Sequence, residues 1–490
     1  MKLLARLGLG IGALVVLLVG VVLVRTVTYR APAAVDLAAV KLAAAPIIDQ
    51  AAAALHLSQA IQIRTISHQD KADNQLAEWD RLHDWLATTY PVSHATMTRE
   101  IVAGHTLVYT WAGSDPALKP IVLMAHQDVV PITPGSEKDW THPAFDGVIA
   151  DGAVWGRGSI DDKGSLVTLF EGVEALAKAG FKPRRTVIIV SGHDEEAGGT
   201  GAQAAAKLLK SRGVQAHFVL DEGMATVADF PLLGRPVAIV GIAEKGYATL
   251  RVTAPAPGGH SSAPPKETGV QVLARAITAI TDNAFPMKFQ GPGAQMVKAI
   301  APEASFVVKM AAANEWLFGP LLVSQIGATP AGAATLHTTI APTMLKGSPK
   351  ENVLPQDATA WINYRIAPGQ TPDQVIARAR EVTKGLKVVM EWDRPPNSPS
   401  PVSSTQSEGW KLVAALASDG GKVPVAPGLV TAGTDSRYMT PIASDIYRFQ
   451  PLVASVKDLG MIHGTNEKMS LENLGRMTTF YARLVASAAG

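Results

Sequence analysis

The chain contains no cysteine and almost no excess of charge of either sign. Without cysteine it can form neither a disulfide nor a thiolate metal site, so any metal ion would have to be bound by His, Asp and Glu. Lys and Arg number 44 and Asp and Glu 42, a net charge of +2, which lacks the basic surplus of a typical nucleic-acid-binding protein. No nucleic-acid partner is therefore expected.

Charged residues are scarce overall, at 18%, whereas apolar residues make up 47% of the sequence. This balance is typical of a folded globular protein and excludes a largely disordered chain. The 490 residues exceed what one ordinary hydrophobic core organises, so we expect two domains.

One long uncharged stretch stands at the N-terminus, LGLGIGALVVLLVGVVLV at residues 7–24. As a helix, these 18 residues span about 27 Å, close to the thickness of a bilayer core. A membrane helix is therefore favoured over a buried helix of a soluble domain. The basic residues that flank both ends are balanced and leave the orientation undecided: Lys2, Arg6, Arg25 and Arg30.

A cleaved signal peptide is the main alternative for this stretch. APA at residues 31–33 resembles a cleavage site, but it lies well past the apolar run, and the run is long for a signal peptide. We expect residues 1–30 to be an uncleaved membrane anchor with the rest of the chain outside the cytoplasm, or the protein to be secreted if the helix is removed. The Ala-rich residues 31–54 are expected to form a tether that leads into a first helix.

From about residue 75 onward, short apolar runs alternate with amphipathic helical patterns. Strands are predicted at 121–125, 186–190 and 216–221, with helices between them at 165–180 and 199–213. This order predicts an α/β fold with a mostly parallel sheet and helices on both of its faces. In such a sheet, functional sites gather at the carboxyl ends of the strands.

The pattern changes near residue 243. Strands are predicted at 245–254, 334–345 and 358–367, and helices at 268–280 and 371–385. They indicate a smaller α+β domain at 243–393, inserted between two parts of the larger domain at 45–242 and 394–490. The larger domain is expected to end in a helix that begins near Ser470.

Acidic residues and histidines follow the predicted strands in five separate stretches. Each motif alone is weak, because a lone His-x-Asp is usually a surface pair and Asp-Asp before a helix is often a cap. Their shared position at strand ends favours a metal site. Carboxylate and imidazole ligands suit Zn²⁺, Co²⁺ or Mn²⁺, and two such ions about 3.5–4 Å apart would need an acidic bridge. The candidates are His126, Asp128, Asp161, Asp162, Glu195, Glu196, Asp221 and His463.

The stretch SGHDEEAGG at residues 191–199 supports this interpretation. Asp194, Glu195 and Glu196 stand side by side just after the apolar run TVIIV. Like charges at close range repel, and a carboxylate near a core loses hydration. A bound cation would neutralise these acids.

Several motifs together resemble a known family. MAHQDVVP, GRGSIDDKG, SGHDEEAGGTGA, DEG and HGTNE closely resemble the di-zinc metallopeptidases that include carboxypeptidase S, the aminoacylases and the glutamate carboxypeptidases. EKG followed by GGHSSAPPKET resembles more narrowly the carboxypeptidase S branch and its secreted N-acyl-amino-acid hydrolase relatives. The resemblance covers nearly all of residues 60–488 in the same order. It implies a zinc-exopeptidase-like fold, two Zn²⁺ ions (or Co²⁺ or Mn²⁺), and an inserted lid or dimerisation domain through which a homodimer could form.

The resemblance also implies a role for each matched residue of the first metal. His126 would be its terminal ligand, and Asp128 would hold the imidazole in the correct tautomer. Asp221 would be its other ligand. Asp161 would bridge both metals and would be joined to Asp162 by a cis peptide bond.

For the second metal, the resemblance implies Glu196 and His463 as terminal ligands. Glu195 would be the general base that takes a proton from a metal-bridging water and returns it to the leaving nitrogen. His260, in GGHSS of the smaller domain, would stabilise the tetrahedral oxyanion, often in a partner subunit's site. The alternative for His260 is an ordinary loop histidine.

Substrate contacts are implied for three further residues. Asn352 and Arg365 match positions near the substrate's free carboxylate, and Gly433 matches a glycine-rich loop that offers backbone N–H groups to it. Arg365 could equally be a structural ion-pair partner. Glu467 is either a residue behind the metal ligands or an ordinary acid before a helix. The Met-, Phe- and Trp-rich residues 288–322 either pack on the surface or form an apolar entrance for an acyl chain.

The predicted function is metal-dependent hydrolysis of the amide bond next to an amino acid with a free carboxylate, as a carboxypeptidase on short peptides. The alternative is an N-acyl-amino-acid amidohydrolase, including one for long acyl chains. A non-catalytic binding protein on the same scaffold is a distant alternative, because such a protein is expected to lose the base or some ligands.

Overall fold

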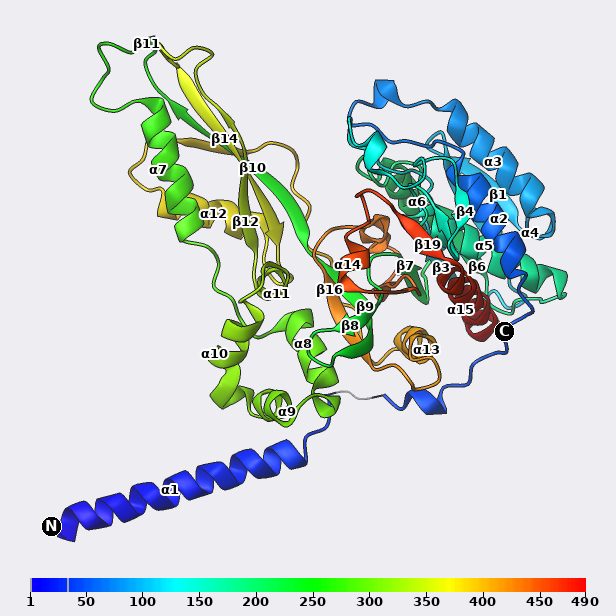
Figure 1. Cartoon of the computed structure of the whole chain (residues 1–490), viewed down its shortest axis with the longest axis horizontal. Coiled ribbons are helices and arrows are strands. Elements are labelled where there is room, and N and C mark those ends of the chain that lie inside the picture. The colour runs from blue at the N-terminus through cyan, green and yellow to red at the C-terminus, as the bar shows by residue number, and fades with distance from the viewer. Residues whose placement is uncertain (1, 33–34) are drawn as a thin grey trace.

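A mixed sheet of ten strands forms the larger part of the molecule in the computed structural model, which describes residues 2–32 and 35–490 (Figure 1). Its strand order is β1-β2-β6-β3-β7-β17-β9-β8-β18, and β16 pairs with β9. The central strands β6, β3, β7 and β17 are parallel, whereas β1, β2 and the β8–β9 pair are antiparallel additions. The strands are β1 (Thr98–Val102), β2 (Thr106–Trp111), β3 (Ile121–Met124), β6 (Val187–Ser191), β7 (Phe218–Asp221), β8 (Thr226–Phe230), β9 (Arg235–Glu244), β16 (Val425–Val430), β17 (Ile446–Arg448) and β18 (Val453–Ala454).

Both faces of the central strands are buried, which explains their unbroken apolar sequences. On β3, Ile121 and Leu123 point to one core, and Val122 and Met124 point to the other. The predicted covering of both faces is therefore confirmed. The first core includes side chains of α3 (Ala77–Thr89), α5 (Lys163–Lys178), α13 (Glu408–Ala417) and α15 (Leu471–Ala489), and the second includes side chains of α6 (Thr200–Ser211) and the 3₁₀ helix η5 (Asp435–Met439). α2 (Gln50–Ile61) and α4 (Pro91–Thr96) pack on α5.

A separate antiparallel sheet follows directly after β9 in the chain. Alternate residues of its strand β10 are buried, as the alternating sequence predicts. Two helices cover it, and each begins with a capping box, at Thr268 and at Thr371. The elements are β12 (Thr339–Lys346), β14 (Asp357–Ile366), β10 (Gly246–Pro255) and β15 (Val389–Trp392), with α7 (Gly269–Asp282) and α12 (Pro372–Val382).

The strand predicted at 334–345 begins later than expected. Residues 330–336 form a helix, α11 (Pro330–Leu336), and β12 starts only at Thr339. Thr329 caps this helix by accepting a hydrogen bond from the backbone of Gly332, and Pro330 occupies its first turn. Both are helix-start signals that the sequence interpretation overlooked.

Residues 288–322 fold mainly into helices. The first of them, α8 (Gly291–Ile300), packs on β16 of the main sheet, where Ile300 joins a core with Phe230 and Ile239. A 3₁₀ turn, α9 (Phe306–Ala313) and α10 (Glu315–Ile326) follow. The domain bounds remain a prediction, since α8 belongs in space with the main sheet although it lies within 243–393.

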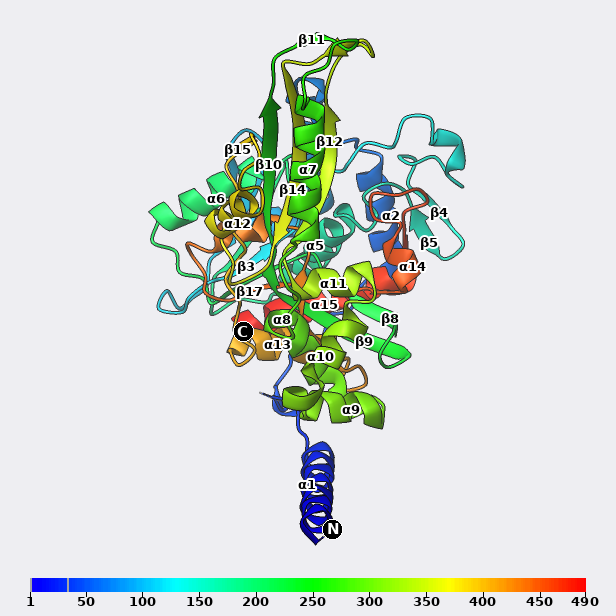
Figure 2. The same ribbon diagram turned by 90° about the vertical axis from the view of Figure 1, so that its left-hand side faces the viewer.

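The N-terminal helix α1 (Lys2–Val27) projects from the body and is exposed along most of its length (Figures 1 and 2). Its segment Arg6–Val27 is long and apolar enough to cross a membrane, although a signal sequence would meet the same description. The choice between anchor and signal therefore stays a prediction, and part of the APA motif, Ala33, lies outside the described residues.

Shorter elements complete the described chain. They are the three-stranded sheet β4 (Val148–Ala150), β5 (Ala153–Trp155) and β19 (Lys468–Ser470), the pair β11 (Gly259–His260) and β13 (Val353–Leu354), α14 (Val456–Leu459), and the 3₁₀ turns η1 (Leu37–Ala39), η2 (Lys71–Asp73), η3 (Glu137–Asp139) and η4 (Ala301–Glu303).

Candidate active site

Three neighbouring strands of the main sheet deliver acids and a histidine to one edge. The strands β6, β3 and β7 are adjacent and parallel, so their carboxyl ends lie together. His126 follows β3, Glu195 and Glu196 follow β6, and Asp221 ends β7. These residues therefore gather at the sheet edge to which the sequence pattern points.

Asp161 stands at the centre of this cluster. Its Oδ1 lies 2.9 Å from His126 Nε2, and its Oδ2 lies 3.1 Å from His463 Nε2. His463 Nε2 also lies 3.0 Å from Glu196 Oε1. Each carboxylate oxygen of Asp161 thus faces a different histidine, and the peptide bond to Asp162 is cis.

Asp128 links the segments that follow β3 and β6 through hydrogen bonds. Its Oδ1 and Oδ2 accept hydrogen bonds from the backbone N–H groups of Glu195 and Glu196, each at 3.1 Å. Ser67 donates a third, at 2.6 Å, and His126 Nδ1 lies 3.3 Å from Oδ1. Because Asp128 is fully buried, these contacts fix both the imidazole and the Glu195–Glu196 turn.

The three adjacent acids have three different surroundings. Asp194 accepts hydrogen bonds from the backbone of Thr200 and Gly201 at the start of α6, and Lys71 Nζ lies 3.0 Å from it. Glu196 faces His463. Glu195 Oε1 lies 3.9 Å from a guanidinium nitrogen of Arg437. One acid therefore stabilises a helix, and two face the site.

Asp162 and Asp221 are buried beside the cluster. Asp162 Oδ2 accepts the backbone N–H of His126 at 3.0 Å, and its other oxygen lies 3.3 Å from Gln450 Nε2. Asp221 Oδ2 accepts the backbone N–H of Ser436 at 2.8 Å.

Glu467 holds the loop that carries Asp161. Its Oε1 accepts the backbone N–H groups of Ile160 and Asp161 at 2.8 and 3.1 Å, and Arg157 donates to its Oε2 at 2.7 Å. Glu467 and Arg157 are both buried. Of the two sequence interpretations of Glu467, the structure thus favours a residue that supports the candidate ligand Asp161 over an ordinary acid before a helix.

The site carries more carboxylates than it has fixed positive charge. Burial raises the pKa of Glu195, Glu196 and Asp221 above the usual range. Hydrogen bonds with Asp161 and Glu196 raise the pKa of His463 to about 10. Burial opposes ionisation of Asp161, but hydrogen bonds with His126 and His463 lower its pKa. A divalent cation would balance this negative charge.

Sequence reasoning missed two residues of the 3₁₀ helix η5, Asp435 and Arg437. Arg437 is largely buried beside Glu195, and its Nε lacks a hydrogen-bond partner among the described residues. Asp435 is buried, with both carboxylate oxygens unpaired there. A Cβ on Gly192 would lie 2.0 Å from Asp435 Oδ2, so this glycine makes room for the carboxylate. The sequence signal for both residues was the motif TDSR at 434–437, which contains Asp435 and Arg437 and directly follows Gly433.

Two predicted substrate residues lie near Arg437. A Cβ on Gly433 would lie 2.6 Å from Arg437 Nη1, so the glycine permits this close approach. Arg365 stacks on Tyr247 at 4.7 Å from the ring centroid. Burial and the positive charge of Arg437 both lower the pKa of Arg365. Arg365 of the small sheet and Arg437, which lies 3.9 Å from Glu195, are therefore close enough to influence each other's charge.

The other two predicted substrate residues lie elsewhere. His260 is exposed on β11, at the end of the small sheet farthest from the main sheet (Figures 1 and 2). Its Nδ1 lies 2.7 Å from Ser262 Oγ. Asn352 is next to it, since its carbonyl accepts the backbone N–H of Ser261 at 3.1 Å. The structure places this pair together but not beside Asp161 of the same chain.

A second group of possible metal ligands lies beside Gln127: Asp80, His83 and His105. Gln127 Nε2 donates to the carbonyls of His105 and Ser191, so its Oε1 must accept from His83 Nε2, at 2.8 Å. This network supports the backbone between His126 and Asp128.

The chain belongs to Peptidase family M20/M25/M40, whose sequence model matches residues 122–487. It is 36% identical over 439 residues to "Probable carboxypeptidase S-like 2" of Dictyostelium discoideum, covering 88% of this chain and 84% of the relative. It is likewise 36% identical over 443 residues to human "N-fatty-acyl-amino acid synthase/hydrolase PM20D1", covering 88% and 87%. The crystal structure of the M20 family metallo-carboxypeptidase Sso-CP2 from Sulfolobus solfataricus shares the fold, with a TM-score of 0.66 at 15% identity, over 89% of this chain and 98% of that one.

The protein is therefore a carboxypeptidase S-like metallohydrolase, as the sequence motifs predicted. The family implies metal ions, and the residues present fit them. His126, Asp161 and Glu196 each offer a ligand atom within 4.8 Å of the others, and the cluster has the excess negative charge that a cation would balance.

Proposed function

We propose that the protein hydrolyses the amide bond next to an amino acid with a free α-carboxylate, and that it acts on short peptides as a carboxypeptidase. The position of Asp161 between His126 and His463 carries this proposal, because one carboxylate aimed at two histidines is the arrangement that a two-metal site needs.

Two zinc ions, or Co²⁺ or Mn²⁺ in their place, would be held by five residues. When bound, such ions lower the pKa of a water molecule toward about 7 and polarise the amide carbonyl. Asp128 and Glu467 would keep the ligands in position through the hydrogen bonds described above. The five residues are His126, Asp161, Glu196, Asp221 and His463.

Glu195 would act as the general base. Its carboxylate accepts a proton from the attacking water and delivers it to the leaving nitrogen. Burial raises the pKa of Glu195, which favours its holding the proton between the two steps. Its backbone N–H is fixed by Asp128, so the side chain starts from a defined place.

The substrate carboxylate would be bound by guanidinium groups and backbone donors near Glu195. Arg437 and Arg365 supply the positive charge, and an Arg can bind a carboxylate through two parallel hydrogen bonds. Gly433 would leave its backbone accessible. His260 and Asn352 would contact the oxyanion and the substrate from the small sheet of a second copy in a homodimer, since they lie far from Asp161 of their own chain.

The alternative substrate is an N-acyl amino acid, which shares the free carboxylate and the scissile amide. The relatives named as N-fatty-acyl-amino acid hydrolases favour this alternative. Residues 1–30 would hold the enzyme at a membrane, with the body outside the cytoplasm.

A substrate panel on the metal-loaded full chain tests the proposal. We expect turnover of a blocked dipeptide with a free C-terminus and little turnover of the same dipeptide as its C-terminal amide. Cleavage of an N-oleoyl amino acid in preference to the dipeptide would select the alternative. Equal cleavage of the free acid and the amide, or no cleavage of any compound, would contradict the proposed recognition.

A further inference from the structure

Helices α9 and α10 carry a group of exposed apolar side chains that nothing in the described chain covers. α10 has the sequence EWLFGPLLVSQI, in which Glu315 is the only charged residue and Leu322 is the only buried one. We call this group the α9–α10 face. Its large apolar side chains are between 40% and 64% exposed: Phe306, Val307, Trp316, Leu317 and Leu321.

The end of the N-terminal helix is fixed beside this face. Arg25 donates to the carbonyl of Ala313, the last residue of α9, at 3.0 Å. Asn314 Nδ2 lies 3.2 Å from Thr26 Oγ1 and 3.3 Å from the carbonyl of Val22. Thr26 and Asn314 are fully buried, so this contact is a packed junction and not a loose encounter.

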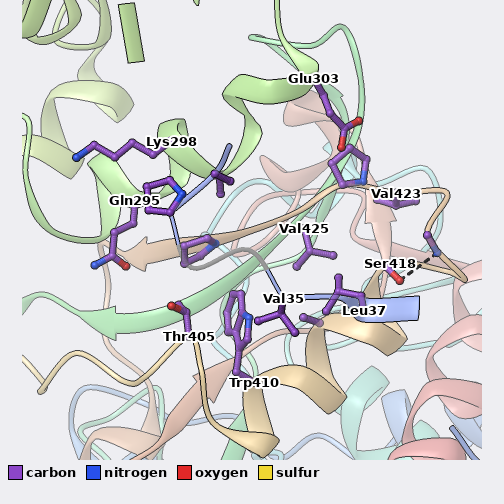
Figure 3. Close-up of a pocket in the computed structure, with 17 residues that line it drawn as sticks. Val35, Leu37, Gln295, Lys298, Glu303, Thr405, Trp410, Ser418, Val423 and Val425 are labelled. Atoms are coloured by element: carbon purple, nitrogen blue, oxygen red, sulfur yellow. Dashed lines mark hydrogen bonds between the residues drawn. The ribbon is translucent and has the colours of Figure 1, made fainter. Parts of the chain in front are cut away.

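The chain after α1 is also held against the body. Tyr29 donates to the carbonyl of Lys298 on α8 at 3.1 Å. Farther on, Val35 and Leu37 pack against the main core and, with Trp410, line a cavity of about 380 Å³ (Figure 3). These contacts restrict how the body can turn relative to α1.

The junction fixes the depth of the α9–α10 face relative to a bilayer. The apolar run of α1 ends at Val24, and Arg25 marks the boundary at which charged groups of a membrane helix reach the headgroups. Ala313 binds this arginine, and Trp316 follows three residues later. The face therefore lies at headgroup depth, where Trp is favoured. Both views place α9 and α10 at the same end of the molecule as α1, opposite β11 (Figures 1 and 2).

We propose that the α9–α10 face rests in the interfacial layer of the lipid bilayer that α1 spans. Exposing these apolar side chains to water is unfavourable, and burying them in the boundary between headgroups and acyl chains removes that cost. The lone charge of α10 does not oppose this, because Glu315 is paired with Lys298 at 2.5 Å. The proposal rests on α1 being a membrane anchor and does not depend on the substrate.

The absence of cysteine makes a site-specific test simple. Single cysteines introduced by Phe306→Cys and Trp316→Cys in the full chain, reconstituted in phosphatidylcholine vesicles, can each carry one environment-sensitive fluorophore. Ile101→Cys and Val389→Cys are matched controls, since both side chains are exposed and apolar, at 53% and 56%, but lie outside this face.

We expect nitroxide-labelled phosphatidylcholine to quench the labels at 306 and 316 several-fold more than those at 101 and 389, with a blue shift of their emission. Quenching no greater than in the controls would overturn the proposal. So would labels at 306 and 316 that are shielded from aqueous iodide but not quenched by the lipid nitroxide, because a second protein would then cover the face.

Discussion

The two sheets present their candidate functional residues in opposite ways. At the edge of the main sheet, Asp128 and Glu467 are fully buried and accept hydrogen bonds from the backbone of Glu195 and Asp161. Beyond the small sheet, His260 is exposed on β11, and its imidazole lies within hydrogen-bond distance of Ser262 Oγ. The first set gathers within one chain, whereas His260 lies away from Asp161 of its own chain. The comparison teaches that one sheet holds its candidate residues in a buried hydrogen-bond network, whereas the other presents them on an exposed surface.

Removal of the general base is expected to have the largest effect. Glu195→Ala and the isosteric Glu195→Gln should lower kcat by about 10²–10⁴-fold, because no group then accepts the proton. Metal content, measured by elemental analysis, should stay at the wild-type value. Undiminished turnover in either variant would refute the assignment of the base.

The small-sheet histidine should have the next largest effect. His260→Ala should lower kcat by about 10²–10³-fold, the typical loss for one oxyanion donor, without changing metal content or melting temperature. Lys266→Ala, which is exposed in the same loop, is the control and should be silent.

Mixing two inactive variants sharpens the comparison further. If His260 acts on a partner's site, co-refolded Glu195→Ala and His260→Ala chains should regain about a quarter of wild-type activity, since half of random dimers are mixed and each has one intact site. No recovery from two inactive variants would show that His260 acts within its own chain.

Loosening the support of Asp161 should act through metal affinity. Glu467→Gln weakens the bond to Arg157, and we expect metal affinity to fall by about 10–100-fold. Competition with a chelator measures this directly, and added metal should restore turnover. Glu472→Gln, on the exposed side of α15, is the control; an equal loss in both variants would argue against a specific role.

The smallest effect is expected on stability and its pH dependence. Burial opposes ionisation of Asp194, but hydrogen bonds from Thr200 and Gly201 lower its pKa below the usual 3.8. A lowered pKa stabilises the fold above the unfolded-state value, and this contribution is lost as the pH falls through the folded-state value. Asp194→Asn should cost about 1–3 kcal/mol at neutral pH.

The pH dependence separates this cause from a general packing defect. Thermal melts of wild type and Asp194→Asn should converge as the pH falls below about 3.8. Asp84→Asn, an exposed position on α3, should match wild type throughout. A constant gap at all pH values would contradict the charge explanation.

Much of the main sheet could be predicted because its signals are local. The apolar runs at 121–125, 186–190 and 216–221 are β3, β6 and β7 to within two residues. The prediction at 334–345 was wrong in its first residues, because Thr329 and Pro330 start a helix there. The position of α8 on the main sheet was not predictable, since it depends on a long-range contact with β16.

The sequence by itself determined which chemical groups stand at the strand ends and, through their order, the family and its metal-dependent chemistry. Only the tertiary structure decided how the three adjacent acids divide their tasks: Asp194 turns to α6, Glu195 toward Arg437 and Glu196 to His463. It also brought Arg437 beside Glu195 and placed His260 at the distant end of the small sheet. The physical reason is that a strand pattern fixes which residues reach an edge, whereas the direction of each side chain depends on its partner. Asp194 bonds to the nearby start of α6, but Glu195 and Glu196 face Arg437 and His463, which are far away in the chain.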